Sequence, residues 1–225
     1  MLVMGLDTAL QRCSVAILRD GEVLADEMRE MERGHAEQLA PMAASALAKA
    51  GVAIREFDRI GVVVGPGGFT GVRVALSFAR GLGIGRGLKI VGVTSLAALA
   101  AGVGGSGLTA AVINARRDQV YAALYGSNGE IILPPFVAEP KEALQLLVDA
   151  GGDAPVTLVG SGVGLLEGLP DNWQLGDASA EIDAKIVAQI AARAPVPEAP
   201  PAPLYLRGPD AKPGKPGIFS AMPPA

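Results

Sequence analysis

The order of predicted elements in the first half of this chain returns in the second half, and this internal repeat restricts the possible folds more than any other feature. Residues 2–24 (LVMGLDTALQRCSVAILRDGEVL) follow the pattern of a strand, a loop, a second strand, a Gly-Glu turn and a third strand. Residues 108–132 (LTAAVINARRDQVYAALYGSNGEII) show the same order. Such self-similarity indicates a duplicated domain.

Each predicted set of three strands is followed by elements of the same kinds. In the first half, apolar spacing predicts helices over 34–50, 71–84 and 96–101 and buried strands over 60–64 and 90–93. In the second half, it predicts a helix over 141–150, a strand over 156–159 and a helix over 180–193. Three antiparallel strands, then helix, strand and helix, made twice, is the plan of the actin-like ATPase (ASKHA) fold. That fold is α/β, and its two duplicated subdomains face each other across a cleft.

We therefore divide the chain into an N-terminal subdomain (1–103), a C-terminal subdomain (104–193) and a tail (194–225). Ten of the 17 prolines fall in the tail, so we expect it to lack regular structure and to be extended or disordered. Leu204, Tyr205 and Leu206 form its one apolar island. We expect this segment to dock on the subdomains.

Composition excludes several classes of protein. Of the 225 residues, 50% are hydrophobic and 19% are charged, which suits a large core and argues against a disordered chain. The single cysteine leaves no internal disulfide, and His35, the single histidine, excludes a metal site with two histidine ligands from this chain. No basic leader precedes Asp7, and glycine and polar residues interrupt the charge-free stretch 90–115. We therefore expect a cytosolic protein without a membrane span.

Basic residues are concentrated in the middle of a chain whose net charge is −4. Residues 59–117 carry seven basic side chains and no acidic one, whereas the segments on either side are acidic. One interpretation is a buried, glycine-rich and alanine-rich segment with a few basic side chains at its rim. The other is a surface directed at an acidic partner or a phosphate. The seven residues are Arg59, Arg73, Arg80, Arg86, Lys89, Arg116 and Arg117.

The segment GPGGFTGVR (65–73) lies between a predicted strand and a predicted helix, with Thr70 as the expected N-cap. Such a turn can bind an anion through its backbone N–H groups, or its glycines can simply let the strand and helix pack closely. It matches neither a P-loop nor a dinucleotide fingerprint. For Asp7, at the first hairpin tip, the alternative to facing a phosphate is capping its own turn. The candidate nucleotide or phosphate site comprises Asp7, Thr8, Gly67, Gly68, Thr70 and Arg116.

Six segments of the sequence, in order, carry a resemblance to a known family. They are LDTALQRCSVAIL (6–18), RGHAEQLAPM (33–42), GPGGFTGVRVALSFARGLG (65–83), GVTSLAALA (92–100), INARRDQVYAALY (113–125) and YLR (205–207), and together they resemble the TsaB family. The resemblance implies the non-catalytic partner subunit of the bacterial machinery that makes N6-threonylcarbamoyladenosine (t6A) on tRNA. It also implies a TsaD-like catalytic subunit and a TsaE-like ATPase as partners, tRNA contact only through the complex, and ATP or ADP at the subunit junction as the one cofactor to consider.

Transferase-active relatives of that family carry two metal-binding histidines in an Asn-His-Leu-Glu-Gly-His segment. The resemblance aligns this segment with residues 94–99 (TSLAAL) of the present chain, where Ser95 and Leu99 replace both histidines. Leucine cannot coordinate a metal ion. We therefore predict that this chain has no metal site, no catalytic residue and no cofactor that it requires.

The predicted helices 34–50 and 71–84 are the expected partner interface, because they carry more apolar surface than so short a chain is expected to cover. Small residues on them would let helices of two subunits approach closely. The resemblance adds His35 to this interface. The full set is His35, Leu39, Met42, Ala46, Val72, Arg73, Leu76, Ala79, Arg80 and Gly83, with its apolar members expected to face outward.

Two other functions stay open at this point. A small ATPase or sugar kinase of the actin-like superfamily would act alone through Asp7, Gly67, Gly68 and Thr70, and the isolated chain would then turn over substrate. A self-associating regulator would instead form a homodimer through the same two helices.

Overall fold

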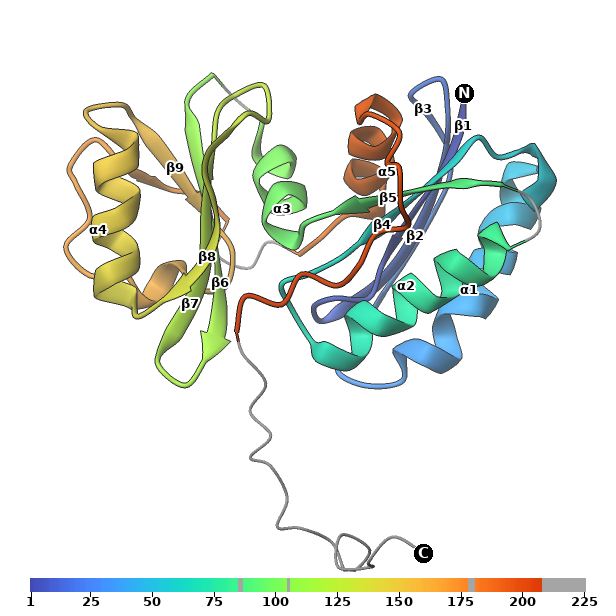
Figure 1. The fold of residues 1–225 in the computed structure, drawn as a ribbon, viewed down its shortest axis with the longest axis horizontal. Coiled ribbons are helices and arrows are strands. Elements are labelled where there is room, and N and C mark those ends of the chain that lie inside the picture. The colour runs from blue at the N-terminus through green and yellow to red at the C-terminus, as the bar shows by residue number, and fades with distance from the viewer. Residues whose placement is uncertain (85–86, 105, 178–180, 208–225) are drawn as a thin grey trace, which may run out of the picture.

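The computed structural model describes residues 1–84, 87–104, 106–177 and 181–207, which form two α/β lobes, each built on a five-stranded sheet (Figure 1). In the first lobe the strand order is β3-β2-β1-β4-β5, and in the second it is β8-β7-β6-β9-β10. The two orders correspond position by position, so the predicted duplication and the actin-like α/β plan are confirmed. The strands are β1 (Leu2–Asp7), β2 (Arg12–Arg19), β3 (Glu22–Glu30), β4 (Arg59–Val63), β5 (Lys89–Val93), β6 (Leu108–Arg116), β7 (Gln119–Tyr125), β8 (Ile131–Ala138), β9 (Val156–Val159) and β10 (Gln174–Leu175).

Strand pairing follows the same rule in both lobes. In the first lobe β1 is antiparallel to β2 and parallel to β4, and in the second β6 is antiparallel to β7 and parallel to β9. The predicted buried strand, β4, lies between β1 and β5 and is parallel to both. A parallel strand covered on both faces is apolar on both, which agrees with the burial of Ile60, Val62 and Val63. Gly61 lets a helix approach the sheet, since a Cβ atom there would lie 2.7 Å from Cβ of Ala191 on that helix.

Helices cover both faces of each sheet. The helices α1 and α2 pack on one face of the first sheet and α5 on the other, while α4 and α3 lie on opposite faces of the second sheet (Figure 1). No helix within the described parts of the chain is long and apolar enough to cross a membrane. The helices are α1 (His35–Ala50), α2 (Phe69–Gly83), α3 (Ser95–Val103), α4 (Pro140–Gly151) and α5 (Ala184–Arg193), with short 3-10 turns at Ile54–Glu56 and Val163–Leu165.

The two lobes exchange their last helices. The helix α3 follows the first sheet in sequence but packs on β6 and β7 of the second, and α5 follows the second sheet but packs on β1, β2 and β4 of the first. The contact of α5 is so close that a Cβ atom at Gly5 would lie 2.0 Å from the carbonyl oxygen of Ala184. A boundary at residue 103/104 therefore separates the two sheets but not the helices that cover them.

The structure differs from the predicted elements mainly in the second lobe. The strand β8 continues through Pro134 and Pro135 to Ala138, beyond the predicted 132. Proline has no backbone N–H group to donate to a neighbouring strand. The strand β8 can contain prolines because it is an edge strand, whose outer side has no neighbouring strand to receive such a bond. The last helix begins at Ala184 rather than at 180, because the Asp183 side chain caps it by accepting a hydrogen bond from the Lys185 N–H at 2.8 Å.

Residues 194–207, called the C-terminal strap below, have no regular secondary structure and run from α5 along the first lobe toward the second (Figure 1). At the start of the strap, Nη1 of Arg59 donates to the carbonyl oxygen of Ala194 at 2.6 Å. Further along, the N–H of Leu204 donates to the carbonyl oxygen of Val64 at 2.8 Å. Residues 208–225 of the predicted tail lie outside the described residues.

The strap ends on the second lobe. Nη2 of Arg207 donates to the carbonyl oxygen of Ala115 at 3.3 Å and to Oε1 of Gln119 at 2.5 Å, and both acceptors flank the turn between β6 and β7. Leu204 is half-buried against the core of the first lobe. Leu204 and Arg207 therefore hold the strap against the two lobes, whereas Tyr205 between them is 51% exposed.

A chain that ends at Arg207 is expected to be more stable than one that ends at Pro203. The shorter chain loses the burial of Leu204 and the hydrogen bonds of Tyr205 and Arg207, together worth about 2–4 kcal/mol. For a chain of this size the thermal midpoint should fall by roughly 5–10 °C, as measured by circular dichroism. Equal midpoints for the two chains would mean that these contacts contribute nothing to stability.

Candidate functional site

The apolar side chains predicted to face a partner are buried in this chain's own core. They are at most 6% exposed and belong to a large hydrophobic cluster that spans the first lobe and extends into the second. The predicted outward orientation was wrong, because α1 and α2 pack on the first sheet through these faces. A Cβ atom at Gly83 would likewise lie 3.2 Å from the Ile90 side chain. The buried residues are Leu39, Met42 and Ala46 of α1 and Val72, Leu76 and Ala79 of α2.

The solvent side of α2 is basic and polar instead. Arg73, Ser77 and Arg80, spaced four and three residues apart, are exposed on it, whereas His35 at the start of α1 is half-buried. Nη2 of Arg80 donates to the carbonyl oxygen of Pro201 at 2.7 Å. Of the predicted interface, Arg73 and Arg80 are therefore exposed and His35 and Gly83 are half-buried, whereas the six apolar members lie in the core.

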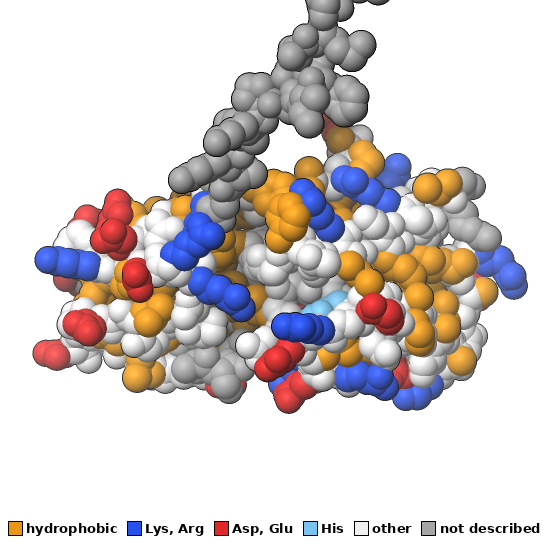
Figure 2. Space-filling view, turned by 90° about the horizontal axis from the view of Figure 1, so that it is seen from below, with side chains coloured by type: hydrophobic (Ala, Val, Ile, Leu, Met, Phe, Trp, Pro, Cys, Tyr) orange, Lys and Arg blue, Asp and Glu red, His pale blue; other side chains and the backbone are white. Residues whose placement is uncertain are grey.

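Two aromatic rings and a guanidinium form an exposed cluster at the beginning of α2, which we call the aromatic stack: Phe69, Arg73 and Tyr205. The ring centroids of Phe69 and Tyr205 are 5.9 Å apart, and Cζ of Arg73 lies 3.6 Å from the Phe69 centroid. Nε of Arg73 donates to the Tyr205 hydroxyl oxygen at 2.8 Å. Hydrophobic and basic side chains lie side by side on the face seen in Figure 2. Sequence reasoning missed this cluster, although an aromatic residue beside glycines at a helix start was a signal for it.

The glycine turn packs against the tip of the first hairpin. The N–H of Gly68 donates to the carbonyl oxygen of Ala9 at 2.8 Å, and the Thr8 hydroxyl donates to the carbonyl oxygen of Gly71 at 2.6 Å. A Cβ atom at Gly71 would lie 1.8 Å from the Thr8 carbonyl oxygen. These contacts support the interpretation that the glycines serve close packing. Because the Gly68 N–H donates to Ala9, it is not free to donate to an anion.

The predicted N-cap of α2 was wrong by two residues. The helix begins at Phe69 with Gly68 at the N-cap position, so Thr70 lies in the first turn and is exposed. Gly68 has an extended backbone and no side chain with which to cap the helix. The hydroxyl of Thr70 is thus not used for capping.

Asp7 is fully buried at the end of β1. Its Oδ1 accepts a hydrogen bond from the Ala9 N–H at 2.8 Å, which confirms the turn-capping interpretation. Its Oδ2 has no hydrogen-bond partner within the described structure. Burial, and to a lesser extent the nearby Glu181 carboxylate, raises the pKa of Asp7 to about 7. A fully buried carboxyl group leaves no room for the several waters that Mg²⁺ retains, so it is poorly placed to hold that ion.

Replacing Asp7 with asparagine should stabilise the protein at pH 7 and above. The pKa of Asp7 is higher in the folded chain than its ordinary value of 3.8, so folding binds a proton and stability falls as the pH rises from about 4 to about 7. The asparagine amide would keep the acceptor for the Ala9 N–H without a buried charge, for a gain of about 2 kcal/mol or more at pH 8. Urea unfolding at pH 5 and pH 8 measures this. An unchanged pH slope in the Asp7→Asn variant would contradict it.

A cavity of about 580 Å³ lies between the lobes beside Asp7's neighbour Glu181. Three carboxylates and one guanidinium line it, so its local charge is negative and disfavours a phosphate group. Oε2 of Glu181 is buried there without a hydrogen-bond partner among the described residues. No motif in the sequence pointed to Glu181. The lining residues are Gln11, Arg12, Glu30, Met31, Glu32, Ser161 and Glu181.

Arg116, the remaining member of the predicted phosphate site, belongs to the second lobe. It ends β6, its backbone N–H donates to Oδ1 of Asn114 at 2.7 Å, and its backbone is left-handed with φ of 60°. Its side chain is exposed. The predicted site is therefore divided: Asp7 and Thr8 are buried, Gly67 and Gly68 pack on the hairpin tip, and Thr70 and Arg116 are exposed on different lobes.

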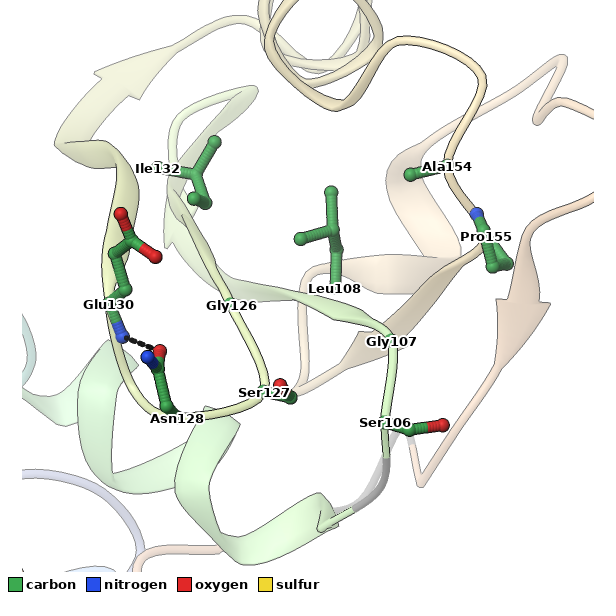
Figure 3. Close-up of a pocket in the computed structure, with 10 residues that line it drawn as sticks. All are labelled: Ser106, Gly107, Leu108, Gly126, Ser127, Asn128, Glu130, Ile132, Ala154 and Pro155. Atoms are coloured by element: carbon green, nitrogen blue, oxygen red, sulfur yellow. Dashed lines mark hydrogen bonds between the residues drawn. The ribbon is translucent and has the colours of Figure 1, made fainter.

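A second cavity, of about 350 Å³, lies at one end of the second sheet (Figure 3). Oδ1 of Asn128 accepts a hydrogen bond from the Glu130 N–H at 2.9 Å in the turn that forms one wall. Among the residues that the structure describes, Glu130 is the one charged residue that lines this cavity. The other lining residues are Ser106, Gly107, Leu108, Gly126, Ser127, Ile132, Ala154 and Pro155.

Ser95 and Leu99, the two positions at which the resemblance implied lost metal ligands, lie in α3. Ser95 begins this helix, with Thr94 as its N-cap, and Leu99 follows one turn later. Ser95 is fully buried and Leu99 is 3% exposed, so both side chains belong to the interior. Within the residues that the structure describes, no three His, Cys, Asp or Glu side chains form a group suited to a metal ion.

Comparison with known proteins gives consistent matches. A family model described as "TsaD: tRNA N6-adenosine threonylcarbamoyltransferase" matches residues 24–194. The tRNA threonylcarbamoyladenosine biosynthesis protein TsaB of Bacillus subtilis is 32% identical over 164 residues, covering 71% of each chain. TsaB of Escherichia coli is 32% identical over 153 residues, which span 63% of this chain and 66% of that protein. The uncharacterized protein ML0378 of Mycobacterium leprae matches all of this chain at 35% identity, but over only 61% of its own length.

Solved structures agree with these matches. A crystal structure from Pseudomonas aeruginosa, described as an uncharacterized protein with similarity to peptidase YEAZ, superposes with a TM-score of 0.81 and 34% identity over 92% of this chain and 99% of that one. YeaZ from the same organism gives a TM-score of 0.75 and 33% identity over 85% of this chain and 90% of that one. The agreement of sequence and fold over most of the chain shows that this protein belongs to the TsaB family.

Proposed function

We propose that this protein is a non-catalytic subunit of tRNA threonylcarbamoyladenosine biosynthesis, and that it binds and supports a TsaD-type threonylcarbamoyltransferase. The names of its TsaB relatives and the TsaD-type family model support the pathway and the kind of partner. A TsaE-type ATPase would complete the assembly, and tRNA would be contacted through the complex. The proposal places the protein in the cytoplasm, together with its tRNA substrate.

One observation favours a binding role over an enzymatic one: the parts that would handle a phosphate are packed against one another. Gly71 lies so close to the Thr8 carbonyl oxygen that no side chain at position 71 would fit. The neighbouring Asp7 carboxyl group is fully buried. A sugar kinase or ATPase would need these groups open to a phosphate and a hydrated cation. ATP or ADP at the junction with the partner stays a prediction for the assembled complex.

The test is co-expression with the TsaD-type and TsaE-type proteins of the same organism. We expect a complex that elutes as one species in size-exclusion chromatography. When the purified subunits are given unmodified tRNA and a threonylcarbamoyl donor, t6A should appear in the tRNA nucleosides, by mass spectrometry, only when all subunits are present. The chain alone should hydrolyse no ATP above background. ATP hydrolysis or sugar phosphorylation by the isolated chain would support the kinase alternative, and a stable homodimer that excludes the TsaD-type protein would support the self-associating regulator.

A further inference from the structure

The aromatic stack exposes more apolar surface than its surroundings explain. Phe69 is 59% exposed and Tyr205 is 51% exposed, although each already contacts the guanidinium of Arg73. Single exposed apolar residues are ordinary, but two aromatic rings flanking an arginine form a contiguous patch of the residue types that dominate binding energy at protein interfaces. The patch has the composition of a docking point.

The arginine of the stack is held in place before any partner arrives. Its Nε donates to the Tyr205 hydroxyl oxygen, and its Cζ lies over the Phe69 ring and 5.7 Å from the Tyr205 centroid. A guanidinium fixed in this way loses little side-chain entropy on binding. Its other nitrogen atoms can still donate to a carboxylate, which guanidinium groups bind in a two-pronged geometry.

Charge indicates what kind of surface can bind here. The helix α2 contains Arg73 and Arg80 and no acidic residue, and neither arginine has an ion pair with any residue that the structure describes. A two-fold contact centred on this surface would bring the arginines of the two copies near one another, with no acidic residue of α2 between them. A different protein that offers carboxylates and an apolar face would complement it.

We propose that the aromatic stack is a docking point for the TsaD-type subunit, and that the C-terminal strap supplies Tyr205 to it. This inference rests on the proposed function and locates the partner contact. The complementary surface on the partner carries at least one carboxylate opposite Arg73 and an apolar area opposite the two rings. The surface is composite, since Phe69 and Arg73 belong to α2 while Tyr205 comes from 132 residues farther along the chain than Arg73.

The position of Tyr205 depends on its neighbours in the strap. Before it, Leu204 is fixed by its hydrogen bond to Val64, and after it Arg207 is fixed to Ala115 and Gln119 of the second lobe. Arg207 is therefore a positioning residue, which acts on the partner through Tyr205. Releasing it should loosen the stack without removing any member of it.

The experiment measures the affinity of the purified chain for its TsaD-type subunit by isothermal titration calorimetry. Phe69→Ala, Arg73→Ala and Tyr205→Ala should each weaken binding about 10-fold to 100-fold, as expected for residues at the centre of an interface. Ile131→Ala is the matched control, because Ile131 is also 59% exposed but lies on β8 of the other lobe. Tyr205→Phe keeps the ring and removes only the hydroxyl acceptor, so its effect should be smaller, a few-fold.

Arg207→Ala tests the positioning role. We expect this variant to increase hydrogen exchange of the backbone at 115–120 and 204–206 in the free chain and to weaken partner binding several-fold. The effects of Arg207→Lys should lie between those of the parent and of Arg207→Ala. A purely structural role would change exchange and the thermal midpoint but not the dissociation constant. Parent-like affinity of Arg207→Ala would overturn this part of the inference.

The outcomes separate the inference from the function on which it rests. If the parent chain does not bind the TsaD-type subunit, the proposed function fails and this inference fails with it. If the parent binds and all three alanine variants, folded by circular dichroism, bind equally well, only the docking point is wrong. If Phe69→Ala and Arg73→Ala weaken binding but Tyr205→Ala does not, the strap is not part of the surface.

Discussion

Ala79→Glu is expected to unfold the first lobe. Ala79 is fully buried on the side of α2 that packs on the first sheet, so the new carboxylate would be taken out of water without a partner. Removing a charge from water in this way costs about 3–5 kcal/mol or more, a large part of the 5–15 kcal/mol that stabilises a typical domain. We expect loss of the cooperative thermal transition in circular dichroism, or a chain recovered only in aggregates.

Ser77→Glu is the matched control for this substitution. Ser77 lies two residues earlier on the same helix and is exposed, so the same new charge should change the thermal midpoint by little. If Ala79→Glu instead melts like the parent while losing partner binding, the core assignment is wrong and the predicted outward face of α2 is restored.

Gly5→Val is expected to prevent α5 from packing on the first sheet. A Cβ atom at this position would lie 2.0 Å from the Ala184 carbonyl oxygen and 3.0 Å from the Ala188 backbone nitrogen. Both are backbone atoms of a helix and cannot rotate away, so either α5 moves or the strand does. The free energy of unfolding should fall by about 4 kcal/mol or more, or the chain should fail to fold.

Urea unfolding followed by circular dichroism measures the effect of Gly5→Val. Gly102→Ala, at an exposed position of α3 with no atom within 4 Å of the added Cβ, is the control. It should leave stability unchanged or raise it by up to about 1 kcal/mol, because alanine favours a helix over glycine. A Gly5→Val variant as stable as the parent would show that α5 does not need this close approach.

The repeated pattern of strands predicted the two sheets because alternation within strands is a local property. The turns at Asp20-Gly21 and Asn128-Gly129 lie at the two predicted Gly-Glu turns, and β4 and β9 match the predicted strands 60–64 and 156–159 within a residue. The exchange of α3 and α5 could not be predicted in this way. An apolar helix face shows that the helix packs on something, but the spacing does not say which sheet it covers.

Apolar spacing also failed to predict which side of α2 faces the solvent. The helix α2 is apolar on nearly every side, and the sequence-based prediction assigned the wrong side to the solvent. A signal was present, since Arg73, Ser77 and Arg80 recur at helical spacing and mark the exposed face. Tyr205 could not be joined to Phe69 from the sequence, because their contact depends on the path of a strap without periodicity.

The exchanged helix α5 also determines when the first lobe can be completed during synthesis. The face that α5 covers consists of Val3, Ala16, Leu18 and Val91, and about 90 residues separate the end of β5 from Ala184. At about 5–20 residues per second, the ribosome needs roughly 5–20 s to supply that helix. During this interval the growing chain holds a formed or forming sheet with one apolar face open to water. The nascent chain is then most exposed to aggregation, and binding by a chaperone would be of greatest use.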